Sequence, residues 1–207
     1  MNASHKALAL VGLIFILSGP HSAFAEEPAE RRFNLVFILA DDLGWRDTSV
    51  YGSTFHQTPN IDRLARSGMM FNNAYAANPL CSPTRCSIMT GLYPGRVGIT
   101  TPSCHLPAAR MEAALAQRGR PDEKAITPVS ATRLNTTYPT LAKTLRAAGY
   151  ATGHFGKWHL GHEPYSPLQH GFDVDVPHFA GPGPAGSYLG PWKFPPPLKF
   201  TGRPGEH

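Results

Sequence analysis

Dense clusters of one charge and, after the first 25 residues, long hydrophobic runs are both missing from this chain. Its 207 residues carry a formal charge of +5, and no dense Lys/Arg run accounts for that excess. Residues 1–25 contribute a single charged side chain, Lys6, so the excess falls by one without them. Such a mild excess attracts an anionic substrate weakly and does not favour a nucleic-acid partner. No later segment has the length of a membrane span, so we expect no membrane partner after residue 25.

The first 25 residues have the features of a signal peptide. Lys6 supplies the positive start, Ala7–Ser18 is the apolar run, and Ala23–Ala25 is a small-residue cleavage site. The apolar run is too short to cross a bilayer, and an uncleaved anchor is the alternative interpretation. We therefore predict an exported protein, either periplasmic or secreted.

Cysteine is scarce as well, and its odd count is informative. The three residues are Cys81, Cys86 and Cys104. An odd number in an exported protein normally indicates a free thiol. The stretch around the first of them shows why that thiol matters.

Cys81 lies just before a predicted helix. Pro83 suits a first helical turn, because its backbone angle is preset and it has no amide hydrogen to lose. Cys81 would then lie where free N–H groups and the helix dipole stabilise anions, and Arg85 could reach the same place one turn later. A nucleophile, a fixed cation and amide donors suit attack on a tetrahedral oxyanion ester. A structural cysteine before a helix is the other interpretation.

Two adjacent acids follow the first apolar run of the mature chain. Phe33–Ala40 has the composition of a parallel strand buried on both faces, and Asp41 and Asp42 come directly after it. Ligands in open α/β sheets bind beyond the carboxyl ends of strands. Neighbouring carboxylates repel each other unless a cation or donors neutralise them, which favours a Ca²⁺ or Mg²⁺ site. One acid could instead only cap a turn.

The rest of the chain predicts an α/β fold with a largely parallel central sheet and helices on both faces. A helix opens at Thr58-Pro59, ends at Gly68 and is followed by a strand over Met69–Ala76. A second helix begins at Thr137–Thr140 and ends at Gly149, and the strand Tyr150–Phe155 follows. The residues expected to face inward are Ile61, Leu64 and Ala65 on the first helix and Leu141, Leu145 and Ala148 on the second.

Two segments lack a regular pattern. Residues 102–136 are interpreted as a surface insertion, in which Ala109–Arg118 could form a short helix with Leu115 inside. Residues 177–207 are rich in Pro and Gly and are interpreted as a loop or the start of a linker. Between these two segments, Lys157 and His159 are two positions apart, so on extended backbone their side chains face the same side.

Read together, these stretches resemble the type I sulfatase family. Cys81-Ser82-Pro83-Thr84-Arg85 followed by Thr90-Gly91 is similar to the first signature of that family. Gly149–Thr152 with Gly156–His159 resembles the second, although Phe155 is bulkier than expected there. The resemblance covers most of residues 33–175 and implies an alkaline-phosphatase-like fold. It implies the domain division 1–25, signal peptide; 26–176, N-terminal part of the catalytic domain; 177–207, loop or linker.

The resemblance also implies a chemistry. In that family the cysteine is oxidised to formylglycine by a formylglycine-generating enzyme, and its hydrate cleaves sulfate esters through a covalent sulfo-enzyme. By resemblance, Asp41, Asp42 and residue 81 hold Ca²⁺. Arg85 stabilises the developing oxyanion, Lys157 binds a sulfate oxygen and His159 assists deprotonation of the diol. The partners implied are an aryl or carbohydrate sulfate and the modifying enzyme, with no nucleic acid.

Several alternatives stay open at this point. A phosphonate or phosphodiester hydrolase of the same superfamily could use the same site, and a non-catalytic binder of sulfated glycan could keep the cysteine unmodified. Cys86 and Cys104 could form a disulfide, or Cys86 could be a buried helix residue. Family members carry further metal and sulfate ligands that we cannot match before His207, so we expect residues 26–207 alone to fold poorly and to lack turnover.

Overall fold

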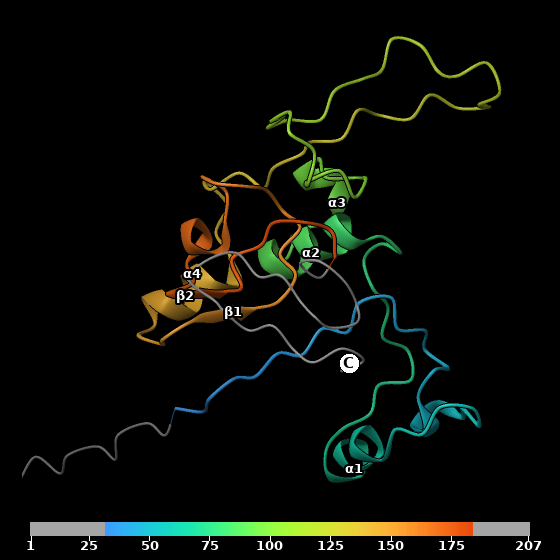
Figure 1. The fold of residues 1–207 in the computed structure, drawn as a ribbon, viewed down its shortest axis with the longest axis vertical. Helices are drawn as coiled ribbons and strands as arrows, with labels where there is room; N and C mark the ends of the chain where they lie inside the picture. The colour runs from blue at the N-terminus through green and yellow to red at the C-terminus, as the bar shows by residue number, and fades with distance from the viewer. Residues whose placement is uncertain (1–31, 184–207) are drawn as a thin grey trace, which may run out of the picture. The chain divides into compact units, whose positions relative to one another are not determined.

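The computed structural model describes residues 32–183. The predicted signal peptide and most of the Pro/Gly-rich segment therefore lie outside the described residues. The chain divides into two units, one ending at Ala40 and one beginning at Asp41. All the regular elements described belong to the second unit and are labelled in Figure 1 where there is room. They are η1 Ser49–Tyr51, α1 Pro59–Ser67, α2 Cys81–Thr90, α3 Pro94–Val97, α4 Leu141–Ala147, β1 Gly153–Phe155, η2 Pro167–His170 and β2 Val174–Val176.

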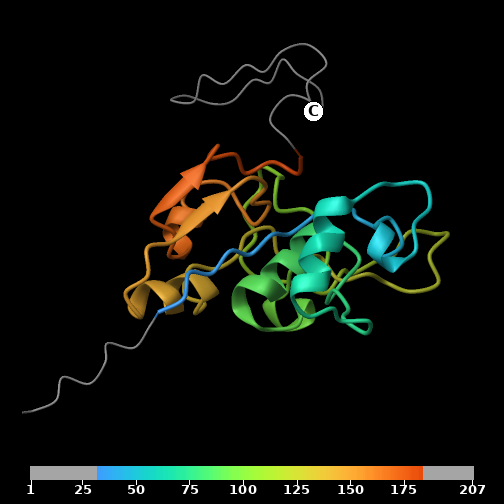
Figure 2. The ribbon, with the colours of Figure 1, turned by 90° about the horizontal axis from the view of Figure 1, so that it is seen from below.

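The two described strands form a short parallel sheet. β1 and β2 pair with Gly153 opposite Val174 and Phe155 opposite Val176, and their arrows lie side by side in Figure 2. The short helix η2 lies in the connection between them. Parallel strands need such a crossover, which a two-residue turn cannot supply. This pairing confirms the predicted α/β class, although β1 is shorter than the predicted strand Tyr150–Phe155.

The core of the second unit lies around α2. Cys86 and Met89 from α2 pack with residues from the segments on either side of it in space, namely Val97, Ile99, Cys104, Ala131, Leu134, Ala142, Trp158 and Leu160. A hydrogen bond of 2.8 Å from Leu134 N to Leu160 O joins two of these segments. Because Trp158 and Leu160 of the segment after β1 belong to this core, that segment packs with α2.

The N-terminal run Phe33–Ala40 does not form the predicted buried strand. It has no regular secondary structure, and Val36 and Ile38 are 85% and 82% exposed. A parallel strand is stable only when neighbours pair with it and cover its faces. Among residues 32–183, β1 and β2 pair with each other and no strand pairs with this run. The apolar pattern therefore predicts burial that this structure does not provide.

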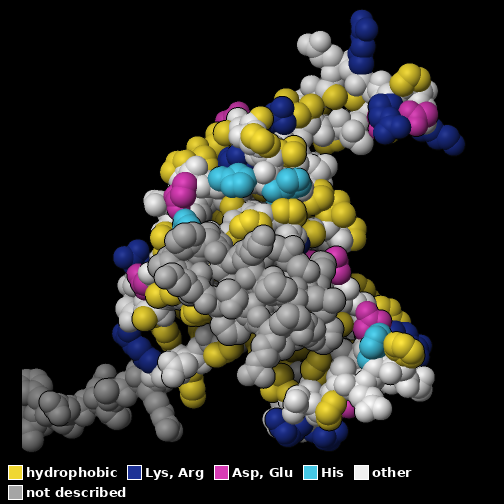
Figure 3. All heavy atoms as spheres, viewed as in Figure 1, with side chains coloured by type: hydrophobic (Ala, Val, Ile, Leu, Met, Phe, Trp, Pro, Cys, Tyr) yellow, Lys and Arg dark blue, Asp and Glu magenta, His cyan; other side chains and the backbone are white. Residues whose placement is uncertain are grey.

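The first predicted helix exists, but its predicted inner face is exposed. α1 begins at Pro59 and is capped by Gly68 as expected, yet Ile61 is 43% and Leu64 67% exposed. The predicted strand Met69–Ala76 is also wrong, because that segment is irregular and Phe71 is 64% exposed. Figure 3 shows hydrophobic side chains at many places on the viewed face. Amphipathic spacing shows which face prefers burial, and a packing partner must then be present.

The second predicted helix is confirmed with a shifted inner face. Thr140 caps α4, and its hydroxyl accepts a 3.2 Å hydrogen bond from Lys143 N. Ala142 is buried, whereas the predicted inner residue Leu141 is 47% exposed. The predicted stop at Gly149 is supported by its φ of +83°, a left-handed conformation that favours glycine.

The insertion between α3 and α4 is irregular, as the sequence predicts. Ala114 and Val129 form an isolated antiparallel bridge, and no helix forms over Ala109–Arg118. Leu115, expected inside that helix, is 91% exposed. Within the described part of the chain, no helix is long and apolar enough to span a bilayer.

The alternative disulfide between Cys86 and Cys104 is not formed. Both thiols are free and buried in the core. The Cys86 Sγ–H donates to Pro83 O at 3.0 Å inside α2. Burial raises the pKa of Cys86 to about 12, and burial likewise raises the pKa of Cys104 to about 11. Cys86 is therefore the buried helix residue that the other interpretation predicts, and both groups are protonated at neutral pH.

Candidate active site

Cys81 is the first residue of α2. The extended Leu80 is its N-cap, and Pro83 is in the first helical turn, where its missing N–H costs nothing. The sequence predicts Cys81 just before the helix, whereas in the structure it is the first helical residue. Free amide groups of the first turn still lie around this residue, as they do at any helix N-terminus.

Asp41 is the residue on which the charged side chains of the site converge. Its Oδ2 lies 2.7 Å from Arg85 Nη2 and 2.9 Å from Lys157 Nζ. Its Oδ1 lies 4.0 Å from Cys81 Sγ. Partial burial raises the pKa of Asp41, but the hydrogen bonds and charges of Lys157 and Arg85 outweigh this effect, and the net pKa is lowered. The carboxyl is therefore ionised well below neutral pH.

Asp42 completes a group of candidate metal ligands. One ligand atom each from Asp41, Asp42 and Cys81 lies within 4.8 Å of the others. Asp42 has a φ of +55°, a conformation that Asp adopts more readily than most residues. The two carboxylates suit a hard cation such as Ca²⁺, whereas a thiol sulfur does not. An oxygen-bearing residue at position 81 would make the donor set uniform, and with such a residue the group would fit Ca²⁺.

The loop after β1 is fixed to the start of α2 by two hydrogen bonds. Arg85 Nη1 donates to Lys157 O, and Ser82 Oγ donates to His159 O at 2.7 Å. Trp158, between these two residues, is only 3% exposed and joins the core, and its Nε1 donates to Tyr165 O at 2.9 Å. The anchored backbone thus holds Lys157 against Asp41, as the contact above shows.

Gly161 ends this loop at a position that only glycine fits. Its φ is +138°, and a Cβ there would lie 2.8 Å from Arg133 Cδ and 2.9 Å from Tyr165 Cβ. Real Cβ contacts are not that short, so any other residue would displace the packed Arg133. The glycine therefore lets the loop approach the buried arginine closely.

His159 is buried with an unusual ring environment. Its Nε2 lies 2.9 Å from Nδ1 of His105, and its Nδ1 is a buried polar atom with no hydrogen-bond partner among the described residues. Burial, and next the charge of Lys157, lower the pKa of His159 to about 4. The imidazole is therefore neutral at neutral pH. No hydrogen bond joins this ring to Cys81 within residues 32–183, so the expected contact with residue 81 stays a prediction.

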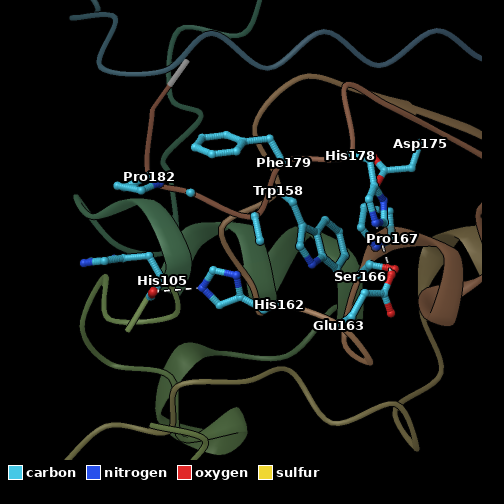
Figure 4. A pocket seen from close by; sticks show the side chains of 12 residues that line it. His105, Trp158, His162, Glu163, Ser166, Pro167, Asp175, His178, Phe179 and Pro182 are labelled. Atoms are coloured by element: carbon cyan, nitrogen blue, oxygen red, sulfur yellow. Dashed lines mark hydrogen bonds and ion pairs between the residues drawn. The ribbon is translucent and has the colours of Figure 1, made fainter. Parts of the chain in front are cut away.

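His105 is the residue of this site that sequence reasoning misses. It lies in the irregular insertion, 54 positions before His159, and no motif surrounds it. It lines a cavity of about 600 Å³, and Figure 4 shows it next to His162, with the Trp158 ring farther along the same cavity. Only the tertiary structure brings the two imidazoles together. No sequence signal identifies His105, because the path of the irregular insertion cannot be predicted from the sequence.

The match to a family model extends from residue 33 to residue 183 and carries the description Sulfatase. The chain belongs to the sulfatase family. Among curated relatives, N-acetylgalactosamine-6-sulfatase of Sus scrofa is 43% identical over 68% of this chain and 24% of its own length. Steryl-sulfatase of Homo sapiens is 39% identical over 72% of this chain and 24% of its own length. A solved structure titled "Crystal structure of Ps i-CgsB" is 37% identical, covers 66% of this chain and 26% of that chain, and has a TM-score of 0.49.

Family membership confirms the predicted α/β fold class of the sulfatase type, of which the described residues hold two parallel strands. This sulfatase chain spans about a quarter of the length of the curated relatives that it matches. Among the described residues, Arg85 and Lys157 pair with Asp41, and Asp41 lies with Asp42 and Cys81 in the candidate metal-ligand group. The backbone carbonyl of His159 accepts a hydrogen bond from Ser82, next to Cys81, and its ring is hydrogen-bonded to His105.

Proposed function

We propose that this chain carries the nucleophile and part of the metal site of a sulfuric ester hydrolase. The observation that supports it most is the ion-pair group in which Arg85 and Lys157 share the Oδ2 of Asp41, beside Cys81. Two fixed cations next to a helix-start nucleophile match the charge of a sulfate ester. Sulfatase relatives at 39–43% identity give independent support.

Each residue has a role in this proposal. Residue 81 acts as formylglycine hydrate, whose first hydroxyl attacks sulfur and expels the alcohol, which leaves a sulfated enzyme. The second hydroxyl then loses its proton, the carbon–oxygen bond to sulfate breaks, and the aldehyde is restored. Asp41 and Asp42, with residue 81, would hold Ca²⁺, which lowers the pKa of the attacking hydroxyl when bound. Arg85 donates to the developing negative charge, and Lys157 holds a sulfate oxygen. The buried, neutral His159 accepts a proton from the diol.

Arg85 and Lys157 can change partners without moving far. Both already neutralise Asp41, and each is only 13–14% exposed, so neither is freely solvated. A divalent cation at Asp41 would take over that neutralisation and leave the two donors for a bound sulfate. Fixed donors in a partly dry site stabilise an oxyanion more strongly than mobile ones in water.

The proposed substrate is a carbohydrate sulfate, with an aryl sulfate as the synthetic equivalent. The support is the relative that is 43% identical, an N-acetylgalactosamine-6-sulfatase. Export of the chain, as predicted from residues 1–25, would give the enzyme access to extracellular glycans and would place the active cysteine in contact with the modifying enzyme during export.

The test expresses the full-length protein together with a formylglycine-generating enzyme. Mass spectrometry of the peptide that spans Cys81 should show loss of the thiol and reaction with a hydrazide probe. The purified protein should then hydrolyse N-acetylgalactosamine-6-sulfate or an aryl sulfate, and removal of Ca²⁺ by a chelator should abolish turnover. Steryl sulfate, a phosphate monoester, a phosphodiester and a phosphonate ester serve as comparison substrates.

Matched variants sharpen this test. Asp42→Asn should raise the Ca²⁺ concentration for half-maximal activity about tenfold or more, because one charged ligand is lost. Asp122→Asn, on an exposed carboxylate 68% accessible, should leave it unchanged. An unmodified thiol after co-expression would contradict the formylglycine role. Faster cleavage of the phosphorus esters would identify the phosphonate or phosphodiester hydrolase, and binding of sulfated glycan without cleavage would identify the binder.

A further inference from the structure

One ring nitrogen of His159 has a hydrogen-bond partner, and the other has none among the described residues. Its backbone carbonyl accepts from Ser82 Oγ, and its Nε2 lies 2.9 Å from His105 Nδ1. Its Nδ1 is buried and has no partner among residues 32–183. The side chain is 1% exposed, so bulk water does not satisfy that nitrogen. A buried polar atom without a partner costs about 1–3 kcal/mol, which makes this one a candidate for contact with a ligand or reacting group.

His105 is held in place from two directions. The buried Arg133 donates through Nη1 to Cys104 O at 3.1 Å and through Nη2 to Leu106 O at 2.8 Å. His162 Nε2 donates to His105 O at 2.9 Å, the dashed line in Figure 4. The backbone on both sides of His105 is therefore fixed, and its ring reaches His159 from a rigid support.

The hydrogen bond between the two rings can run in either direction. Either His159 Nε2–H donates to the lone pair of His105 Nδ1, or His105 Nδ1–H donates to His159 Nε2. In the first, His159 Nδ1 keeps its lone pair; in the second, it carries a hydrogen and cannot act as a base. The identity of the donor thus decides whether His159 can accept a proton at its open nitrogen.

We propose that His105 is a positioning residue that holds His159 as the Nε2–H tautomer, so that the open Nδ1 serves as the proton acceptor. This rests on the proposed function, in which a hydroxyl on residue 81 loses a proton. That proton moves to His159 Nδ1, the O–H electron pair stays on oxygen, and the imidazolium formed keeps its Nε2–H bond to His105. The arrangement follows the logic of nucleophile, base and orienting group, with an imidazole in place of the usual carboxylate.

An orienting group without negative charge suits this site electrostatically. Burial lowers the pKa of His159, and the charges of Lys157, His105 and Arg85 lower it further. A carboxylate in the position of His105 would favour the protonated ring, whereas an imidazole that accepts through Nδ1 fixes the orientation of the ring without a negative charge beside it. His159 then stays an unprotonated base across the neutral range.

The test combines a tautomer measurement with kinetics on the full-length protein. His105→Asn keeps an acceptor near the position of Nδ1, and His105→Leu removes it. His178→Asn is the matched control, because His178 lines the same cavity, bonds Asp175 rather than His159, and has a φ of +61° that Asn tolerates. Long-range ¹H–¹⁵N correlation spectra of ¹⁵N-histidine protein give the tautomer of His159, with its signals assigned from a His159→Gln variant.

We expect a protonated Nε2 and an unprotonated Nδ1 in the wild type, in His105→Asn and in His178→Asn. In His105→Leu the two tautomers should both be populated, and kcat should fall about tenfold or more with little change in KM. His105→Asn should recover most of that loss. A wild-type Nδ1–H tautomer would overturn the proposal, as would an unchanged tautomer and kcat in His105→Leu.

The outcomes separate this proposal from the proposed function. The tautomer of His159 is measured without any turnover, and it decides the role of His105 even if His105→Leu does not fold, because the wild type and His105→Asn remain. Loss of the Cys81 thiol and sulfate ester hydrolysis, measured separately, decide the proposed function.

Discussion

At the scale of single residues, Arg85 makes two contacts with segments distant in the sequence. One of its terminal nitrogens pairs with Asp41 Oδ2 at 2.7 Å, and the other donates to Lys157 O. The planar guanidinium makes both contacts at once, which the single ammonium of lysine cannot do in the same geometry. The side chain therefore links the candidate metal ligand, the start of α2 and the loop that holds Lys157.

We predict that Arg85→Lys lowers kcat of the full-length enzyme about 10²- to 10³-fold, the usual effect of losing one fixed donor to a developing oxyanion. Arg120→Lys is the control, because the Arg120 side chain is 74% exposed and its guanidinium pairs with the surface neighbour Asp122. Steady-state kinetics on the same sulfate ester measure both. A loss of less than fivefold for Arg85→Lys, with the thiol at position 81 converted, would contradict the role of this guanidinium.

At the scale of elements, the insertion between α3 and α4 is anchored by one buried cation. Arg133 is 4% exposed, and its guanidinium donates to the carbonyls of Cys104, Leu106 and Pro107 across the insertion. It thereby gives an irregular segment a fixed path without a helix or strand of its own. Buried carbonyls are satisfied in native structures, and here a side chain performs this role.

We predict that Arg133→Met lowers the free energy of unfolding by about 3 kcal/mol or more, because the buried carbonyls of Cys104 and Thr132 lose this donor and the insertion loses two further bonds. Urea denaturation followed by circular dichroism measures the change. Arg118→Met is the control, since Arg118 is exposed in the same insertion, and should shift the value by less than about 0.5 kcal/mol. Equal effects of the two substitutions would show that the insertion does not depend on the hydrogen bonds of Arg133.

At the scale of the whole molecule, two buried neutral histidines connect stability to pH. Burial lowers the pKa of His159 to about 4, and burial likewise lowers the pKa of His170, which is completely inaccessible. The unfolded chain binds protons at these imidazoles near pH 6.5, before the folded chain does. The contribution of these two histidines to the free energy of unfolding is therefore fully present above about pH 6.5 and is lost as the pH falls towards 4.

We predict that acidification from pH 7 to pH 4 costs at most about 3 kcal/mol through His159, from 1.36 kcal/mol per unit of pKa difference. His159→Gln should remove that part of the slope, and the remaining slope should include the share of His170. The measurement is the free energy of unfolding at a series of pH values. A wild-type stability that does not change between pH 7 and pH 4 would contradict the neutral, buried state of both residues.

Motif spacing predicts the local parts of this structure well. The stretch from Cys81 to Arg85 carries its own helix start, because Pro83 and the one-turn separation act within a few residues. Thr140 and Gly149 define α4 for the same reason. The apolar run Phe33–Ala40 predicts a buried strand, and this fails because burial depends on partners that the run does not contain.

The sequence by itself determined the family signatures, the helix starts and the residue types of the candidate site, since these depend on neighbours along the chain. Tertiary structure alone decided that Asp41 would be shared by Arg85 and Lys157, residues 44 and 116 positions away. It also decided that His105 would meet His159. Such contacts form when the core around α2 packs distant segments together, and their free energy is gained from burial that no local pattern encodes.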